Sequence, residues 1–232
     1  MKPSQSLSRR AIRPIMFFLY AWLASGHGGA AAGSVQLKVV GSLVPPACSL
    51  ALPAGDTVDY GRMLNAELSP DSHTVLPERN LNFSITCDAP AKVALMLQDE
   101  NPATIVPDLI KVVRGEADAN FMANGLGSVN GVNIGIFYVR VVAGTGRNQP
   151  GSLRTLRSDG VQGWSETPVD APLYANGSKA VGFSDGQASV PTALSTVTGR
   201  LAIQPLIRPR ADLPTADEIV LAGSTTLTLY YQ

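Results

Sequence analysis

The chain contains two cysteines, Cys48 and Cys87, and each ends a stretch in which apolar and polar residues alternate as they do along a β-strand. Both lie downstream of an export signal, and disulfides form in the oxidising compartments to which such signals lead. We therefore expect a Cys48–Cys87 disulfide that cross-links an all-β domain, with two buried free thiols as the alternative. In the chain-entropy model, closing a loop of about 39 residues contributes about 4 kcal/mol.

The export signal has three parts in the usual order. A basic segment is followed by an apolar run at residues 15–24 and by three alanines at residues 30–32. The apolar run is about half the length of roughly 20 residues that a membrane-spanning helix needs, so we expect no retained transmembrane anchor. We expect residues 1–32 to be a signal peptide and the protein to reach the periplasm, and from there the cell surface, a fimbrium or the medium.

The mature chain, residues 33–232, has the length of one large β domain. Removing the leader takes away four cations and no acids, which leaves 14 cations against 18 acids and a net charge of −4. This charge offers no basic surface for nucleic acid. Glycine and proline are spread along the whole chain, and no stretch keeps helical periodicity over three turns. The composition is typical of a β-sandwich or barrel.

Alternation and turn residues predict the individual elements. Residues 35–44 form an expected first strand that Pro45-Pro46 ends. Residues 81–98 form an expected hairpin with its turn at residues 88–91, and residues 132–142 a central strand buried on both faces. Residues 107–113 are expected to contain a short helical turn, and residues 144–191 a turn-rich insertion that decorates the sandwich. The other expected strands are residues 58–63, 199–207 and 219–231.

The order of these features resembles that of chaperone–usher pilus subunits. The likeness lies in the strand pattern at residues 34–41, Ala47-Cys48, residues 58–61 and 83–87, and in a penultimate tyrosine, Tyr231. A closer resemblance is to a family of exported proteins of uncharacterised function that are encoded near fimbrial operons. That resemblance extends through residues 191–207 and 219–231 and so covers most of the mature chain.

The resemblance implies an immunoglobulin-like, pilin-type sandwich that lacks one strand and so keeps an open hydrophobic groove. Its implied partners are a periplasmic fimbrial chaperone, an usher and neighbouring pilus subunits. Leu227, Leu229 and Tyr231 would pair with a chaperone or donor strand and line the groove. The alternative is that these three side chains are ordinary core residues.

The sequence departs from the pilus pattern at its mature start. Only Gly33 and Ser34 precede the expected first strand, so we expect a subunit that receives a donor strand but has no arm to provide one. Such a subunit would be terminal, or its sandwich would be completed from within. Three segments could supply the missing strand internally: residues 179–183, 189–194 and 201–207.

Other chemistries find little support in the sequence. Residues 182–186 match the G-x-S-x-G pattern of serine hydrolases, but no helix pattern follows them. The mature chain has one histidine, His73, in a polar loop that is a poor place for a catalytic base. One histidine and two paired cysteines do not make a zinc site. Trp164 lies in a turn-rich segment, where it either contacts a sugar or protein ligand or covers an edge of the core.

We therefore expect a non-enzymatic fimbrial subunit-like or surface adhesion protein that acts through β-strand complementation and needs no cofactor. The alternative is a self-complete periplasmic or secreted β-sandwich that binds a glycan or a protein. Charged substitutions at Leu227, Leu229 and Tyr231 separate the two. They should abolish chaperone capture in the first case and reduce monomer stability in the second.

Overall fold

The computed structural model describes residues 35–115, 119–149, 151–158, 163–167, 169–186, 188–214 and 218–232. The expected signal peptide, residues 1–32, lies outside the described residues. The chain divides into two units, residues 1–43 and residues 44–232.

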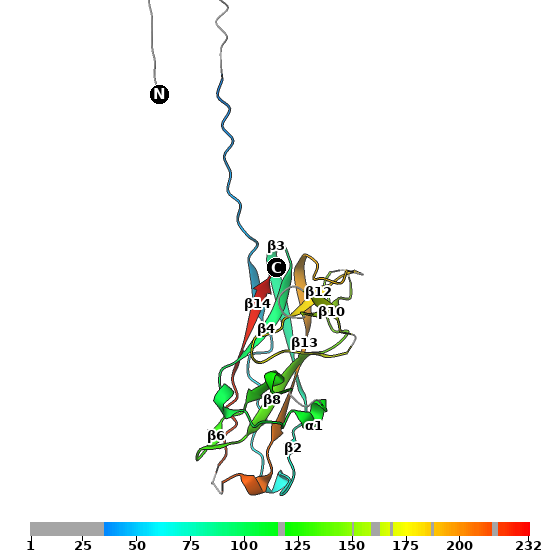
Figure 1. Cartoon of the computed structure of the whole chain (residues 1–232). Coiled ribbons are helices and arrows are strands. Elements are labelled where there is room, and N and C mark those ends of the chain that lie inside the picture. The colour runs from blue at the N-terminus through cyan, green and yellow to red at the C-terminus, as the bar shows by residue number, and fades with distance from the viewer. Residues whose placement is uncertain are drawn as a thin grey trace, which may run out of the picture. The chain divides into compact units, whose positions relative to one another are not determined.

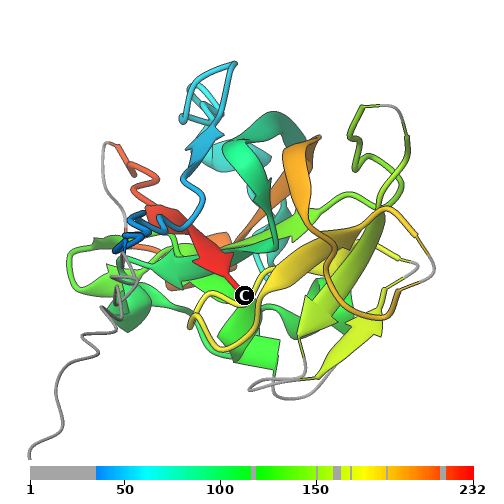
Figure 2. The same cartoon turned by 90° about the horizontal axis from the view of Figure 1, so that it is seen from above.

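Residues 44–232 form a sandwich of two antiparallel sheets (Figures 1 and 2). Sheet A has the order β1-β3-β13-β8-β11, with β2 beside β13 and β5 beside β8. Its strands are β1 (Cys48–Ala51), β2 (Thr74–Val75), β3 (Arg79–Ala91), β5 (Ala123–Gly125), β8 (Gly135–Val141), β11 (Ala171–Pro172) and β13 (Leu194–Ile207).

Sheet B has the order β10-β9-β12-β4-β14. Its strands are β4 (Val93–Asp99), β9 (Arg154–Ser158), β10 (Trp164–Glu166), β12 (Val181–Ser184) and β14 (Thr225–Tyr231). The remaining elements are short: the β6 (Ser128–Val129) and β7 (Val132–Asn133) ladder, α1 (Lys111–Arg114), and the 3₁₀ turns η1 (Asn65–Glu67), η2 (Pro102–Thr104), η3 (Ala119–Met122) and η4 (Arg210–Asp212). The predicted all-β sandwich is confirmed.

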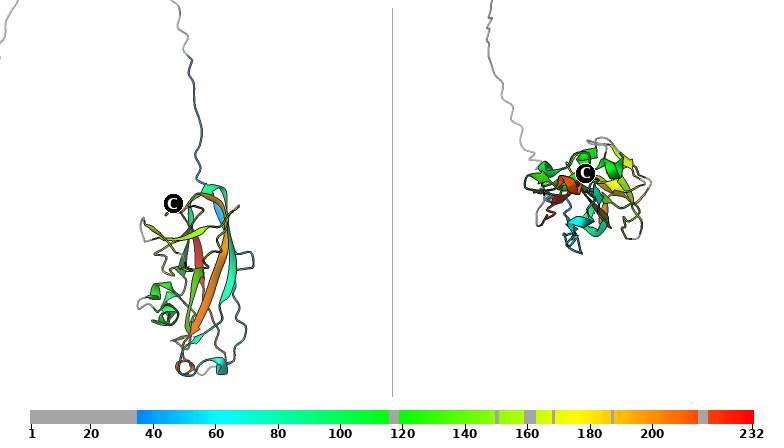
Figure 3. Two further views of the ribbon diagram at one scale, coloured as in Figure 1. Left: turned by 90° about the vertical axis from the view of Figure 1, so that its right-hand side faces the viewer. Right: turned by 90° about the horizontal axis from the view of Figure 1, so that it is seen from below.

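The main core lies between the two sheets, because each long strand turns every second side chain inward. In β3, Phe83, Ile85 and Cys87 are buried and the residues between them are more exposed. Phe83 faces Gly199 across the β3–β13 ladder, where a Cβ atom would lie 2.6 Å from the ring. The glycine therefore makes room for the ring. The long strands β3 and β13 run the length of this sandwich (Figure 3).

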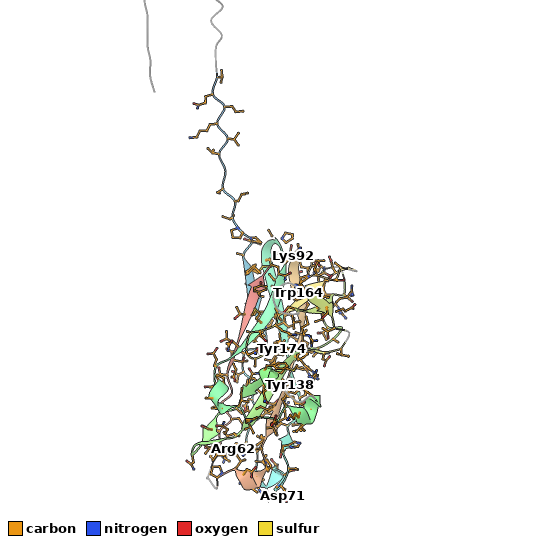
Figure 4. All side chains as sticks on the ribbon, viewed as in Figure 1. Arg62, Asp71, Lys92, Tyr138, Trp164 and Tyr174 are labelled. Carbon is orange, nitrogen blue, oxygen red and sulfur yellow. A yellow bond between two sulfur atoms is a disulfide. The ribbon has the colours of Figure 1, made fainter. Side chains whose placement is uncertain are left out.

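A second apolar cluster covers the outer face of sheet A. Ile136 and Tyr138 of β8 point to it, and Leu109, Ile110 and Met122 from the segment around α1 pack over them. Figure 4 shows Tyr138 and Tyr174 in the same part of the domain. On its other face, β8 sends alternate residues into the main core. The predicted central strand buried on both faces is therefore confirmed as β8 over residues 135–141, whereas residues 132–133 belong to the separate strand β7.

The predicted hairpin at residues 81–98 is wrong in its pairing, although its two strands exist. β3 pairs with β1 and β13 in sheet A, whereas β4 pairs with β12 and β14 in sheet B. The expected turn residues 88–91 belong to β3, and the chain changes sheets at Lys92. Alternation gives the face that each strand buries, but it does not say which strand is its neighbour.

The segment at residues 144–191 is part of the sandwich and not a decoration on it. β9, β10 and β12 come from this segment and are three of the five strands of sheet B, while β11 is the edge of sheet A. The expected strand at residues 199–207 is confirmed within β13, and the expected strand at residues 219–231 is confirmed in β14 from residue 225 onward. The expected helical turn at residues 107–113 corresponds to a turn that leads into α1.

Two expected strands are absent from the described structure. Residues 58–63 form no strand, and neither do residues 35–44. In the unit that ends at residue 43, Val35, Leu37 and Val39 are 95%, 88% and 88% exposed. An extended chain with alternating side chains becomes a strand only when another strand satisfies its backbone groups, and here none does. The expectation that the chain has no donor arm assumed that residues 35–44 form the first strand of the sandwich. Because these residues form no strand, that expectation loses its basis.

Candidate strand-binding groove

Two strand edges from different sheets lie next to each other without a strand between them. β1 ends sheet A and pairs with β3, while β14 ends sheet B and pairs with β4. Within the described residues, neither strand has a partner strand on its other side. The phenol oxygen of Tyr231 on β14 lies 2.9 Å from the Cys48 amide nitrogen on β1, so the edges meet at this end. Figure 2 shows β14, in red, beside the beginning of the domain, in blue.

An open groove of about 990 Å³ separates these two edges. Leu50, Leu52 and Val58 line it on the β1 side, and Leu221 and Leu227 line it on the β14 side. These five side chains are half-buried and pack against the main core. The floor of the groove consists of core residues from both sheets: Leu81, Leu97, Leu126, Phe137, Val139, Leu201 and Ile203. Most of the floor residues are buried, and the half-buried side chains of the two edges form the accessible part of the groove.

The disulfide fixes one end of the groove. Cys48 and Cys87 are bonded, and they are direct partners in the β1–β3 register. The predicted Cys48–Cys87 disulfide is thus confirmed. β1 has only four residues and therefore few ladder hydrogen bonds. The disulfide adds a covalent link that holds this edge of sheet A in place.

The other end of the groove continues into a second hollow of about 420 Å³. The two hollows share Thr57, Val58, Tyr60 and Leu221. The Tyr60 hydroxyl donates a hydrogen bond of 3.3 Å to the Ile203 carbonyl. Burial raises the pKa of Tyr60 to about 12, the Arg79 guanidinium opposes this shift, and the Glu78 carboxylate adds to it. Tyr60 is therefore held as a neutral phenol at the base of the groove.

The raised pKa of Tyr60 makes stability depend on alkaline pH. Unfolded tyrosine ionises near pH 10, so the folded state binds its proton more tightly than the unfolded state does. This contribution to the free energy of unfolding is complete below pH 10 and is lost as the pH rises through about 12. We expect the free energy of unfolding of the Tyr60→Phe variant, measured by denaturant titration, to fall less steeply than that of the wild type as the pH rises over this range. Burial also raises the pKa of Tyr138, so both proteins share the loss of stability that this second tyrosine causes. If the free energy of unfolding fell equally in both proteins, the assignment to Tyr60 would be contradicted.

The residues that the sequence suggested for a chaperone or donor strand fall at different places along β14. Leu227 lines the groove and lies opposite Leu97 of β4. Leu229 packs against the main core, half-buried. Tyr231 closes the end of the groove beside the disulfide and remains 45% exposed. The structure thus brings Leu227 to the groove itself and Tyr231 to its end.

Trp164 lies outside the groove, on β10 at the opposite edge of sheet B from β14. Its ring atoms lie 3.0 and 3.2 Å from where a Cβ atom on Gly182 would be, and Pro191 crowds the same point. On its other side, Trp164 borders a shallow hollow of about 140 Å³ with Met96 and Tyr230. Figure 4 shows Trp164 in the part of the domain near the C-terminus. The ring therefore covers the outer face of sheet B, and its contact with a ligand stays a prediction.

The G-x-S-x-G motif does not form a nucleophile elbow. Ser184 is completely buried at the end of β12, and its hydroxyl donates to the Ala188 carbonyl at 3.4 Å. β13, and not a helix, is the next element along the chain. His73 precedes β2 in the other sheet. The residues that the motif needs for nucleophilic catalysis are therefore not arranged around Ser184.

None of the three segments expected to complete the sandwich internally lies at the free edge of β14. Residues 179–183 lead into β12, which pairs with β4 and β9. Residues 201–207 belong to β13, between β3 and β8. Residues 189–194 lead into the same β13. Sequence reasoning missed Leu50, Leu52 and Leu221 as groove residues, because alternation indicates which side chains are buried but not which of them lie at an edge without a partner strand.

No three histidine, cysteine, aspartate or glutamate residues in the described part of the chain come together as metal ligands would. No helix in it is both long enough and apolar enough to span a membrane.

The chain is similar to several known proteins. The chain is 26% identical over 226 residues to Protein GltF of Escherichia coli (strain K12), covering 84% of this chain and 87% of that protein. A chain in a solved structure of a chaperone–usher pilus is 14% identical with a TM-score of 0.36, and the match covers 87% of this chain and 97% of that one. The model of the DUF1120 family, described as proteins of unknown function, matches residues 37–137. The predicted resemblance to an uncharacterised family is therefore confirmed, and over these residues the chain is similar to the DUF1120 proteins.

Proposed function

We propose that this protein is an exported, non-enzymatic subunit of a fimbria-like surface structure and that it works by β-strand complementation. In this proposal the groove between β1 and β14 accepts a strand, and residues 35–43 donate one. The observation that carries the proposal is an open apolar groove between two strand edges that have no partner strand in the described structure.

The groove has the two properties that strand addition requires. Its edges present backbone N–H and C=O groups that an added strand can pair with. Its floor and sides present apolar side chains, including Leu50, Leu97 and Leu227, that alternate side chains of the added strand can cover. A chain with such a groove is liable to aggregate until the groove is filled.

Residues 35–43 have the matching properties of a donor. Val35, Leu37 and Val39 fall on one side of an extended chain, while Gln36 and Lys38 fall on the other. As a strand, nine residues extend over about 30 Å, and the seven residues of β14 over about 23 Å, at the usual rise per residue. The arm is therefore long enough to pair with β14 along its full length.

The chemistry of the connection favours donation to another copy. Pro45-Pro46 joins the arm to β1, and consecutive prolines favour a continuous extended chain over a reversal. The arm would have to reverse at this point to lie beside its own β1. A neighbouring subunit of the same fold is thus the proposed acceptor.

The export signal and the open groove suggest the location and the partners of the protein. An export signal at residues 1–32 would deliver the chain to the periplasm, where a fimbrial chaperone would protect the open groove until an usher passes the subunit to its neighbour. The assembled subunit would stand at the cell surface and take part in adhesion there. None of these steps requires a catalytic group or a cofactor.

The test compares the oligomeric state of arm variants exported to an oxidising periplasm. The mature chain, residues 33–232, is expected to polymerise or be degraded alone, and to be recovered with a co-expressed fimbrial chaperone. Leu37→Asp with Val39→Asp places two charges on the side of the arm that would enter the groove. We expect this double variant to lose polymerisation in light scattering after size exclusion, and to bind an added peptide of residues 35–43.

The matched control is Gln36→Asp with Lys38→Asp, which changes the opposite side of the arm and should still polymerise. A wild-type chain that is a stable, cooperatively folded monomer and ignores the peptide would contradict the proposal. That result would favour the alternative, a self-complete β-sandwich whose loops bind a glycan or a protein.

A further inference from the structure

The side chain of Tyr231 spans the end of the groove and bonds to the backbone of the opposite edge. Its hydroxyl accepts a hydrogen bond from the Cys48 amide at 2.9 Å and lies 3.4 Å from the Cys48 carbonyl, to which it donates. One phenol thus satisfies both backbone groups of a single residue on β1. The contact joins sheet B to sheet A at the C-terminal end of the chain.

The register of β1 explains why these two backbone groups are available. Cys48 lies directly opposite Cys87, and the Asp88 amide donates to the Ala47 carbonyl at 3.0 Å. In an antiparallel ladder this pattern makes Cys48 and Cys87 a non-hydrogen-bonded pair, whose N–H and C=O groups point away from each other's strand. The Cα–Cα distance of 4.0 Å agrees with such a close pair. Cys48 therefore directs its backbone groups to the open edge, and Leu50, two residues on, does the same.

A strand added along β1 would form hydrogen bonds with the outward-pointing N–H and C=O groups of Cys48 and Leu50. It can pair with Leu50, but the Tyr231 hydroxyl occupies the position where it would pair with Cys48. Both sides of this contact are firmly held. The disulfide anchors Cys48. The β14–β4 ladder anchors Tyr231, because Tyr231 pairs with Val93 and the Gln232 amide donates a hydrogen bond of 3.1 Å to the Lys92 carbonyl.

We propose that Tyr231 is a positioning residue that acts as an end stop for the strand accepted by the groove. This inference rests on the proposed strand complementation and adds what sets the register of the strand. β1 begins and β14 ends at this contact, so the two edges run in opposite directions and an added strand can be antiparallel to only one of them. β14 is the longer edge, and an arm antiparallel to it would place its first residues at Tyr231. The end stop thus fixes which residue of the donor arm, Val35, meets the disulfide end.

The experiment measures how the affinity of a donor peptide depends on its length. The acceptor is the mature chain carrying Leu37→Asp and Val39→Asp, so that its own arm does not compete. The probes are a fluorescent peptide of residues 35–43 and the same peptide with Val-Thr added at its N-terminus. With Tyr231 present, we expect the two peptides to bind within about twofold of each other, because the added residues find no open edge.

In Tyr231→Ala we expect the longer peptide to bind at least tenfold more tightly than the shorter one. Tyr231→Phe keeps the ring and removes the hydroxyl, so it should lose the slow hydrogen exchange of the Cys48 amide and show an intermediate length dependence. Tyr230→Ala, on the outward side of β14, is the control and should behave as the parent protein does.

Equal length dependence in Tyr231→Ala and the parent protein would overturn the end stop while leaving strand complementation intact. Failure of both peptides to bind any of the proteins would overturn the complementation itself, and the end stop with it.

Discussion

Replacing Leu227 by glutamate is expected to abolish strand uptake and to leave the domain folded. Leu227 is half-buried on β14, lines the groove and faces Leu97. In the open domain the glutamate carboxylate can reach water. Under an added strand it would be buried without a partner, which costs several kcal/mol. We expect at least a ~100-fold loss of affinity for a peptide of residues 35–43, equivalent to about 2.7 kcal/mol.

The matched control is Thr228→Glu. Thr228 is the next residue on the same strand and points to the opposite, exposed face. It should bind the peptide as the wild type does, which separates charge in the groove from charge on β14. Denaturant unfolding supplies the second measurement, and the free energy of unfolding of the uncomplexed Leu227→Glu protein should change by less than about 1 kcal/mol. A loss of several kcal/mol in a monomeric protein would instead mean that Leu227 is covered by the chain itself.

Removing the disulfide should have the largest effect on stability. We expect the double variant Cys48→Ala and Cys87→Ala to lose about 4 kcal/mol of unfolding free energy, given the sequence separation of 39 residues. The physical reason is both the freed loop in the unfolded chain and the weak hold on β1, whose four residues pair with β3 alone. Urea unfolding under oxidising and reducing conditions measures the difference.

The double variant is its own control for reduction. A thiol reductant should lower the free energy of unfolding of the wild type and leave that of the double variant unchanged. A loss below about 1 kcal/mol would mean that β1 stays attached without the bond, and that the groove keeps its edge through packing of Leu50 and Leu52 alone.

The sequence predicted the fold class and the five longest strands, β3, β4, β8, β13 and β14, because burial on one face leaves a period of two in the residues. β8, β13 and β14 were visible in this way. The partners of the strands were not, because alternation carries no information on which edge a strand joins. The change of sheet at Lys92 is the clearest case, since residues 81–98 read equally well as a hairpin.

The groove was harder to predict than the sheets. Its β1 side runs through residues 52–60, which form no strand, although a strand was predicted to begin at residue 58. The segment proposed as its donor was predicted to be a first strand, because alternation indicates that a chain can pair but not the molecule in which it pairs. One signal was available: Pro45-Pro46 separates the alternating residues 35–44 from Cys48. A strand of the same sheet does not need such a spacer before the residue that anchors it.

The disulfide and the change of sheet at Lys92 together define a path for mechanical force. Tension on residues 35–43 would enter the domain at Cys48 and pass through the sulfur atoms to Cys87 on β3. The backbone then continues through Lys92 into β4. From β4 the force reaches β14 across a ladder of seven residue pairs, which is loaded along its length, so that its hydrogen bonds resist shear together. A chain of such subunits would carry its pull through one covalent bridge and one ladder in each domain, and the rest of the sandwich would be largely unloaded.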